Sequence, residues 1–148
     1  MKKLTLLTIT IILLLSMLFI PVSAKEAITE VEYFDDGSYC VSEIVVDDSL
    51  ASRTIYTKSG TKTNTYYSAS GNALFSLSVR GTFNYNGTVA RATASSYSYG
   101  INSSLWSFVS GSSSYTANKA TATGTFSSLG NQKTLSVTLA CDQDGNLS

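Results

Sequence analysis

The sequence predicts an all-β protein: a single antiparallel β-sandwich, immunoglobulin-like or jelly-roll-like, preceded by an N-terminal β-hairpin that follows a cleaved helical signal peptide. Short runs in which apolar and polar residues alternate recur along the chain, and such alternation is typical of half-buried strands. Turn residues separate these runs at intervals of about 8 to 12 residues, as in sandwiches and barrels. No segment after residue 24 keeps a helical period.

Residues 1–24 have the three parts of a secretory signal peptide. Lys2 and Lys3 supply the positive charge, residues 4–20 are uncharged and rich in Leu and Ile, and the segment ends with small residues up to Ala24. A retained membrane anchor is the alternative, but the apolar run is shorter than the ~20 residues that a spanning helix needs. We therefore expect cleavage after Ala24 and a secreted, extracellular product.

The rest of the chain divides into an acidic hairpin arm, residues 25–48, and a β-sandwich body, residues 49–148. In the arm, two runs of β-branched and aromatic residues, 28–34 and 39–46, flank Asp35-Asp36-Gly37, a strong turn signal. This pattern predicts a β-hairpin. The remaining length suffices for one domain with its own core and is short for two.

In the body, seven strands are predicted. Their residues are 53–58, 61–67, 73–85, 88–97, 104–109, 115–126 and 133–141. Turns are expected at Ser59-Gly60, at 70–72, at 110–112 and at Asn86-Gly87, the last of type I′. Alternation places one set of side chains from each of two strands on the core face: Phe75, Leu77, Val79, Gly81 and Phe83 from one, and Leu135, Val137, Leu139 and Cys141 from the other.

Charge is distributed unevenly. Eight of the ten acidic residues lie between residues 26 and 48, whereas residues 49–140 contain seven cations and no acid. One interpretation is that the body binds an anionic partner and that the arm shields it. The other is that the arm packs on the body and the charges compensate. We prefer the second, because seven cations spread over that length do not form a dense basic patch, and we expect neither a nucleic-acid partner nor, after signal cleavage, a membrane.

Two cysteines, Cys40 and Cys141, leave two alternatives open. Exported chains often contain disulfides, so the pair is a candidate bond that would join the arm to the last strand. The alternative is two separately buried thiols that act as small apolar side chains.

The chemistry of catalysis is poorly represented in the sequence. The chain contains no His, and a serine nucleophile needs an activating base; a pair with Lys58 or Lys119 has no supporting spacing. Asp142, Asp144 and Asn146 alternate like calcium ligands, but the chain ends before a twelfth-position Glu, so we interpret them as a turn. We expect no enzyme activity, no catalytic residue, no metal site and no cofactor.

Tyrosines provide the candidate binding surface: Tyr66, Tyr67, Tyr97 and Tyr99. Exposed tyrosines on a sheet stack on sugar rings or cover a protein partner. Because neighbouring strand residues face opposite sides, one of Tyr66 and Tyr67 must point away from the core. The alternative is that the tyrosines fill a half-buried sheet surface. We expect Trp106 to belong to the core.

Several stretches carry a resemblance to a known family. They are Arg53-Thr54, 57–62, Tyr66-Tyr67, Gly71 with 73–76, Gly81-Thr82-Phe83-Asn84-Tyr85-Asn86-Gly87, 102–104 with Trp106, 137–139 with Cys141, and 145–148. With these, the chain resembles a family of small uncharacterised secreted proteins of Gram-positive bacteria, a domain of unknown function. The resemblance implies a signal peptide, an Asp-Gly hairpin and a β domain, and adds no catalytic residue. It also implies that family members carry a Cys near the position of Arg91-Ala92. This chain has no Cys there, so the usual partner of Cys141 is absent, and the resemblance weakens the case for a bond between Cys141 and Cys40.

The expected function is a secreted, non-enzymatic extracellular binding or interaction module. Its partner is unknown, with a cell-wall polymer, a glycan or a protein as the candidates. The first alternative is a structural or self-assembling cell-surface or matrix protein, because Ser-, Thr- and Tyr-rich strands with few charges can pair edge to edge. A secreted antagonistic peptide or toxin is a further alternative.

Overall fold

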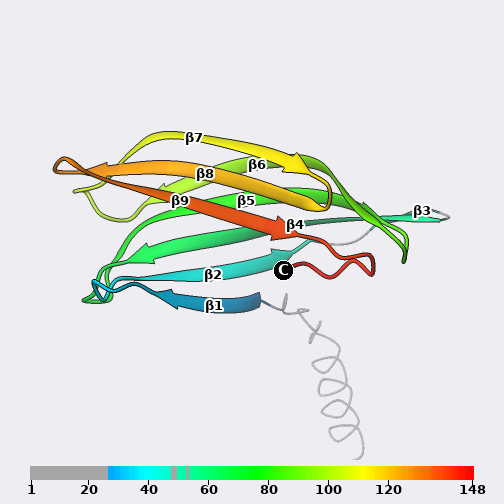
Figure 1. Cartoon of the computed structure of the whole chain (residues 1–148), viewed down its shortest axis with the longest axis horizontal. Coiled ribbons are helices and arrows are strands. Elements are labelled where there is room, and N and C mark those ends of the chain that lie inside the picture. Colours follow the sequence, from blue (N-terminus) through cyan, green and yellow to red (C-terminus); the bar gives the residue numbers. More distant parts are fainter. Residues whose placement is uncertain (1–26, 48–49, 53) are drawn as a thin grey trace, which may run out of the picture.

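The computed structural model describes residues 27–47, 50–52 and 54–148. Within them, the strands are β1 (Ala27–Tyr33), β2 (Tyr39–Val46), β3 (Leu50–Ser52), β4 (Ile55–Tyr67), β5 (Ala73–Tyr85), β6 (Ala90–Ile101), β7 (Ser107–Thr116), β8 (Lys119–Ser128) and β9 (Asn131–Ala140). Two antiparallel sheets pack face to face, which confirms the predicted all-β sandwich (Figure 1). The predicted signal peptide, residues 1–24, and residues 48–49 at the expected boundary lie outside the described part.

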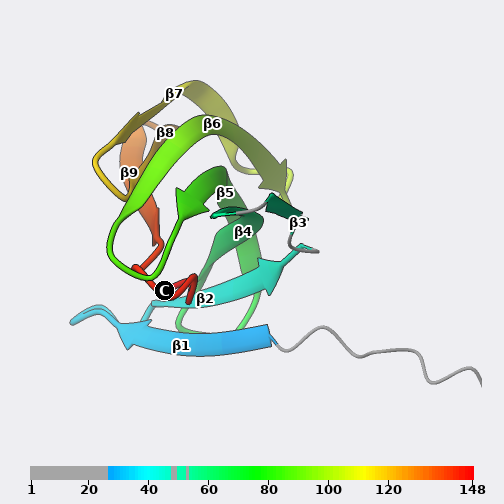
Figure 2. The same cartoon turned by 90° about the vertical axis from the view of Figure 1, so that its right-hand side faces the viewer.

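Both sheets are meanders. The larger sheet has the order β1-β2-β4-β5-β6, with the short β3 also paired to β4, and the smaller one has the order β7-β8-β9 (Figure 2). Immunoglobulin-like and jelly-roll folds require Greek-key connections, so that part of the prediction is wrong for the described strands. Short turns join most consecutive strands, and a short turn can connect only antiparallel neighbours. Strands that follow each other in the sequence therefore lie side by side, and no Greek-key crossing forms among the described strands.

The predicted hairpin is confirmed and is built into the larger sheet. β1 pairs with β2 from Ala27↔Val45 to Tyr33↔Tyr39. The turn closes with Phe34 N–H donating to Ser38 O at 2.9 Å, and Gly37 has a φ of +78°, which favours glycine. β2 in turn pairs with β4 along its whole length.

Among the described residues, two ion pairs connect the acidic hairpin to the body. Lys62 Nζ lies 4.0 Å from Glu30 Oε2, and Arg80 Nη1 lies 2.5 Å from Asp47 Oδ2. Together with the strand pairing, these contacts support the interpretation that the arm packs on the body and that opposite charges compensate.

Two glycines that predict turns lie inside strands instead. β4 runs through Gly60 without a break, and β7 runs through Gly111. A Cβ at Gly60 would collide with the Leu147 side chain, and one at Gly111 would lie 2.9 Å from ring atoms of Phe108 and Tyr97. The turns expected at Ser59-Gly60 and 110–112 are therefore wrong, because these glycines make room for large side chains.

The turns themselves also differ from the prediction at two places. A turn after Thr116 divides the predicted strand 115–126, and Ala117 there has a φ of +50° without a Gly or Pro to signal it. Asn86 has no positive φ, so the turn is not type I′, which needs positive φ at both central residues. Asn86 Oδ1 instead accepts hydrogen bonds from Thr88 N–H and Val89 N–H, at 3.1 and 3.0 Å.

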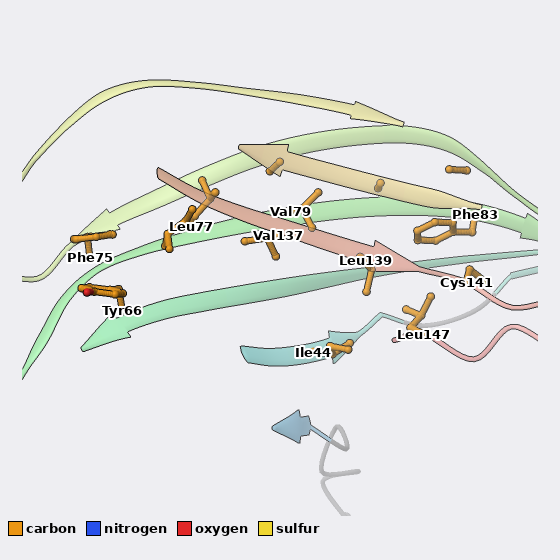
Figure 3. Packing of buried hydrophobic residues seen from close by; sticks show 14 of the residues in the cluster. Ile44, Tyr66, Phe75, Leu77, Val79, Phe83, Val137, Leu139, Cys141 and Leu147 are labelled. Carbon is orange, nitrogen blue, oxygen red and sulfur yellow. The ribbon is translucent and has the colours of Figure 1, made fainter. Parts of the chain in front are cut away.

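The core lies between the two inner faces (Figure 3). The alternation predicted for residues 73–85 and 133–141 is confirmed, because the side chains of both predicted apolar rows are buried, apart from Gly81, which has none. The largest buried side chains are Phe75, Phe83, Phe126, Leu77, Leu139, Val79 and Val137. Trp106 is half-buried and packs on Phe75, with ring centroids 4.6 Å apart, as expected for a core residue.

Cys40 and Cys141 are both buried and free. Cys40 pairs with Tyr66, whereas Cys141 pairs with Leu147, which contacts β4 at Gly60. Tyr66 and Gly60 are six residues apart, or ~20 Å along a strand, and Figure 3 shows Tyr66 and Cys141 at opposite ends of the core. A disulfide needs Cα atoms within ~7 Å, so the candidate bond is wrong and the alternative of two buried thiols holds.

A matched pair of leucine substitutions tests the core. Leu77 is 0% exposed and Leu105 is 65% exposed. Leu77→Ala should lower the free energy of unfolding by about 2–5 kcal/mol because it leaves a cavity, whereas Leu105→Ala should change it by less than about 0.5 kcal/mol. Denaturant titration followed by tryptophan fluorescence measures both; equal effects would contradict the packing.

Thiol reactivity tests the state of the cysteines. Burial, with Glu32 nearby, raises the pKa of Cys40 to about 11, and burial raises the pKa of Cys141. Both thiols should resist a thiol-specific reagent at pH 8 in the folded protein, and both should react after denaturation. Because the folded-state pKa is the higher one, the contribution of Cys40 to stability is complete below the unfolded value of ~8.5 and is lost as the pH rises through about 11. Absence of reactive thiols in the denatured protein would indicate a disulfide.

Candidate functional site

Three tyrosines from β1, β2 and β4 form a row across the outer face of the larger sheet. The register places Tyr33 opposite Tyr39 and Tyr39 opposite Tyr67. Ring centroids are 5.6 Å apart for the first pair and 4.8 Å apart for the second, whose planes differ by only 4°. Tyr33 is 74% exposed, and the other two are half-buried. We call this row the tyrosine ladder.

Local structure holds the ladder in place. Tyr33 and Tyr39 flank the hydrogen-bonded turn of the hairpin, and Tyr67 ends β4. Stacked aromatic rings at these separations attract each other beyond their burial alone. The hydroxyl of Tyr39 approaches the next turn and lies 3.7 Å from the place where a Cβ of Gly71 would be. The ladder is thus preorganised before any ligand arrives.

An uncharged hollow of about 590 Å³ adjoins the end of β4 that carries the ladder. Its lining comes from the turn after Tyr67, from the start of β5 and from the segment after β6: Ser68, Ser70, Asn72, Ala73, Leu74, Asn102, Ser103, Ser104 and Leu105. The turn is ordered by its own hydrogen bonds, since Ser68 N–H donates to Asn72 O at 2.9 Å and Asn72 Nδ2 donates to Ser70 Oγ at 3.0 Å. The hollow offers neutral hydroxyl and amide groups.

Hydroxyl side chains cover the outer face farther along the sheet, but they pair with one another. Thr63 and Ser78 are hydrogen-bonded at 2.8 Å, and Ser59 and Thr82 at 2.9 Å. These groups are already partly satisfied across the strands. The ladder and its hollow therefore combine aromatic surface with polar groups in a way that the hydroxyl rows do not.

The surroundings of the ladder are acidic. Residues 27–47 contain six carboxylates and no Lys or Arg. Asp36 accepts hydrogen bonds from the side chain and the backbone N–H of Ser38, and these bonds lower the pKa of the Asp36 carboxyl. Glu32, Asp35 and Glu43 are exposed. Glu32 points to the face of Cys40, opposite Tyr33, so the exposed carboxylates on the side of the ladder are those of the turn and Glu43.

The four tyrosines predicted from sequence do not form one surface. Tyr67 belongs to the ladder, whereas Tyr66 is 5% exposed and stacks on Phe75 in the core at 5.1 Å. Its neighbour in the sequence faces the other way, as strand alternation requires. Tyr97 and Tyr99 lie on the inner face of β6 against Phe108, at 6.3 and 3.8 Å. These two rings are 38% and 50% exposed.

Tyr33 and Tyr39 were missed by the sequence-based interpretation, although a signal for them exists. Asp36 is the central residue of the predicted turn, and each of the two tyrosines lies three residues away from it in the sequence. A hairpin centred there must pair them. Hairpin symmetry thus identifies two rungs of the ladder, but the third depends on the pairing of β2 with β4.

Other features of the described residues are weaker candidates for a binding site. A smaller hollow of about 280 Å³, lined by Ile55, Tyr85, Val89, Arg91 and others, is mainly apolar. No three His, Cys, Asp or Glu side chains of the described residues lie close enough together to hold a metal ion. Asp142 accepts backbone hydrogen bonds from Asp144 and Asn146 at 2.9 and 2.8 Å, which confirms a turn there. No helix within the described ranges is both long and apolar enough to span a membrane.

Comparison with protein-family models, with curated protein sequences and with solved structures found no match to this chain.

Proposed function

We propose that the protein is a secreted, non-enzymatic module that binds an extracellular glycan through the tyrosine ladder. The observation that supports this most is the row formed by Tyr33, Tyr39 and Tyr67, stacked at 5.6 and 4.8 Å on the outer face of the sheet. Tyr33, at the end of the row, is 74% exposed and offers its ring to the apolar face of a sugar, while the stacked rings of Tyr39 and Tyr67 behind it hold it in place.

The adjoining hollow supports a sugar as the ligand. Sugars carry many hydroxyl groups, and a binding site needs a few well-placed polar groups to orient them. Ser68, Ser70 and Asn72 provide such groups directly after Tyr67. Their mutual hydrogen bonds hold them in place, so that little entropy is lost when a ligand binds.

The proposal gives these residues no catalytic role. Ser68 Oγ is hydrogen-bonded to Ser70 Oγ at 2.9 Å, and a serine hydroxyl becomes a nucleophile only beside a base. The side chains of the turn bind and orient rather than react.

Self-assembly through the edge of β1 is less favoured. β1 is an edge strand and carries Glu30 and Glu32. Charged side chains on an edge strand oppose pairing with another strand. Two copies meeting along β1 would bring like charges together, so we place the binding function first.

We also propose that residues 1–24 form a helical signal peptide that is removed on export. Protein recovered from the culture medium should begin at Lys25, because the small residues before it suit the processing enzyme. N-terminal sequencing or intact mass measurement checks this. Full-length protein held in the membrane fraction would contradict secretion.

Two tyrosine substitutions test the proposed binding surface. Tyr33 is 74% exposed in the ladder, and Tyr115 is 52% exposed at the end of β7. Tyr33→Ala should weaken retention on immobilised cell-wall glycan by about 2- to 10-fold, the equivalent of about 0.5–1.5 kcal/mol of aromatic stacking. Tyr115→Ala should leave retention unchanged. Equal retention of both variants and the unmodified protein would refute the ladder as the site.

A further inference from the structure

We infer that the glycan bound by the tyrosine ladder carries free amino groups, so that the ligand is a cationic sugar polymer. This inference rests on the proposed glycan-binding function and adds the chemical class of the ligand. It comes from the charge around the ladder, from the way in which the protein itself pairs a cation with aromatic rings, and from the polar groups beside Tyr67.

The charge around the ladder favours a positive ligand. Residues 27–47 contain six carboxylates, of which Glu30 and Asp47 pair with cations of the body. Hydrogen bonds from Ser38 lower the pKa of the Asp36 carboxyl, and the charge of Lys133 lowers it further by a smaller amount. In the part of the chain that the structure describes, no cation pairs with Glu32, Asp35 or Glu43, and all three side chains are exposed.

Two of these acids lie on the side of the ladder. Asp35 lies in the turn between Tyr33 and Tyr39. Glu32 directly precedes Tyr33 in β1 and therefore points to the opposite face, beside Cys40. Glu43 is on the same strand face as Tyr39, four residues along β2, or ~13 Å away. An amine of a sugar bound at the Tyr33–Tyr39 end of the ladder would therefore lie close to Asp35, with Glu43 farther along the same face of β2.

The tyrosine rings themselves favour a cation. Lys133 Nζ lies 5.0 Å from the ring centroid of Tyr66 and 5.2 Å from that of Phe34. An ammonium group within ~6 Å of an aromatic face is attracted by the ring quadrupole. On the outer face the same pairing is available at Tyr33, which ends the row and is 74% exposed, so that a protonated amine of the ligand would meet its ring there.

The same charge disfavours anionic polymers. Phosphate-rich wall polymers and nucleic acids would be repelled by the carboxylates of the hairpin. A basic peptide would satisfy the charge, but it would not need the hydroxyl and amide groups of Ser68, Ser70 and Asn72. A sugar bearing amines uses the rings, the acids and the neutral polar groups together.

Matched glycans provide the test. The probes are soluble oligomers of β-1,4-linked glucosamine and the same oligomers with every amine acetylated, titrated calorimetrically into the purified chain at a pH where the free amines are protonated. We expect the free-amine oligomer to bind about tenfold more tightly, since several exposed ion pairs each contribute only a small factor. The preference should disappear in 1 M salt, where the Debye length is ~3 Å.

Two aspartate variants provide the matched control. Asp35 and Asp144 are both exposed turn residues, but Asp144 lies in the C-terminal turn, which starts beside Cys141 at the far end of the core. Asp35→Asn should reduce the preference for the amine form, and adding Glu43→Gln should reduce it further. Asp144→Asn should leave it unchanged. Oligolysine serves as a charge-only probe and should bind more weakly than the free-amine oligomer.

The outcomes separate the inference from the proposed function. Equal affinity for the two oligomers would overturn the inference and leave glycan binding intact. Binding of neither oligomer, with no retention on wall glycan, would overturn both. Oligolysine binding as tight as that of the amine oligomer and unaffected by Tyr33→Ala would show simple charge attraction and would also overturn the inference.

Discussion

Eight consecutive residue pairs join β2 to β4 and make the acidic hairpin part of the larger sheet. This pairing sets several features at once. It brings Tyr39 beside Tyr67 on the outer face, places Cys40 beside Tyr66 on the inner face, and brings Glu30 to Lys62. A slip of one residue would move every hairpin side chain to the other face and would break up the tyrosine ladder.

Close packing between the sheets depends on positions without side chains. Gly60 admits Leu147 from the C-terminal segment, and Gly124 admits Leu77, whose Cδ1 atom is 2.9 Å from the place of a Cβ. Protein interiors tolerate few voids or overlaps, so these glycines match the large side chains that face them. The result is a thin, aromatic core that leaves the outer faces to tyrosine and hydroxyl residues.

Charge links the hairpin to the proposed ligand. Uneven distribution of acids along the chain first suggests a shield over a basic body, but Arg80 and Lys62 are engaged with Asp47 and Glu30. Asp35 and Glu43 remain exposed on the side of the ladder. In the proposal made above, the acidic part of the chain, and not the basic part, is therefore where electrostatics would select a partner.

The sequence by itself determined the sandwich class, the hairpin and the buried rows of β5 and β9, because alternation and turn residues act locally along the strand. It also assigned Trp106 to the core. The turns predicted at Gly60 and Gly111 were wrong, because a glycine that ends a strand cannot be distinguished in the sequence from one that accommodates a distant side chain. The sheet order, the free state of Cys40 and Cys141 and the third rung of the ladder were decided by the tertiary structure, because each depends on which distant strands pair and in what register.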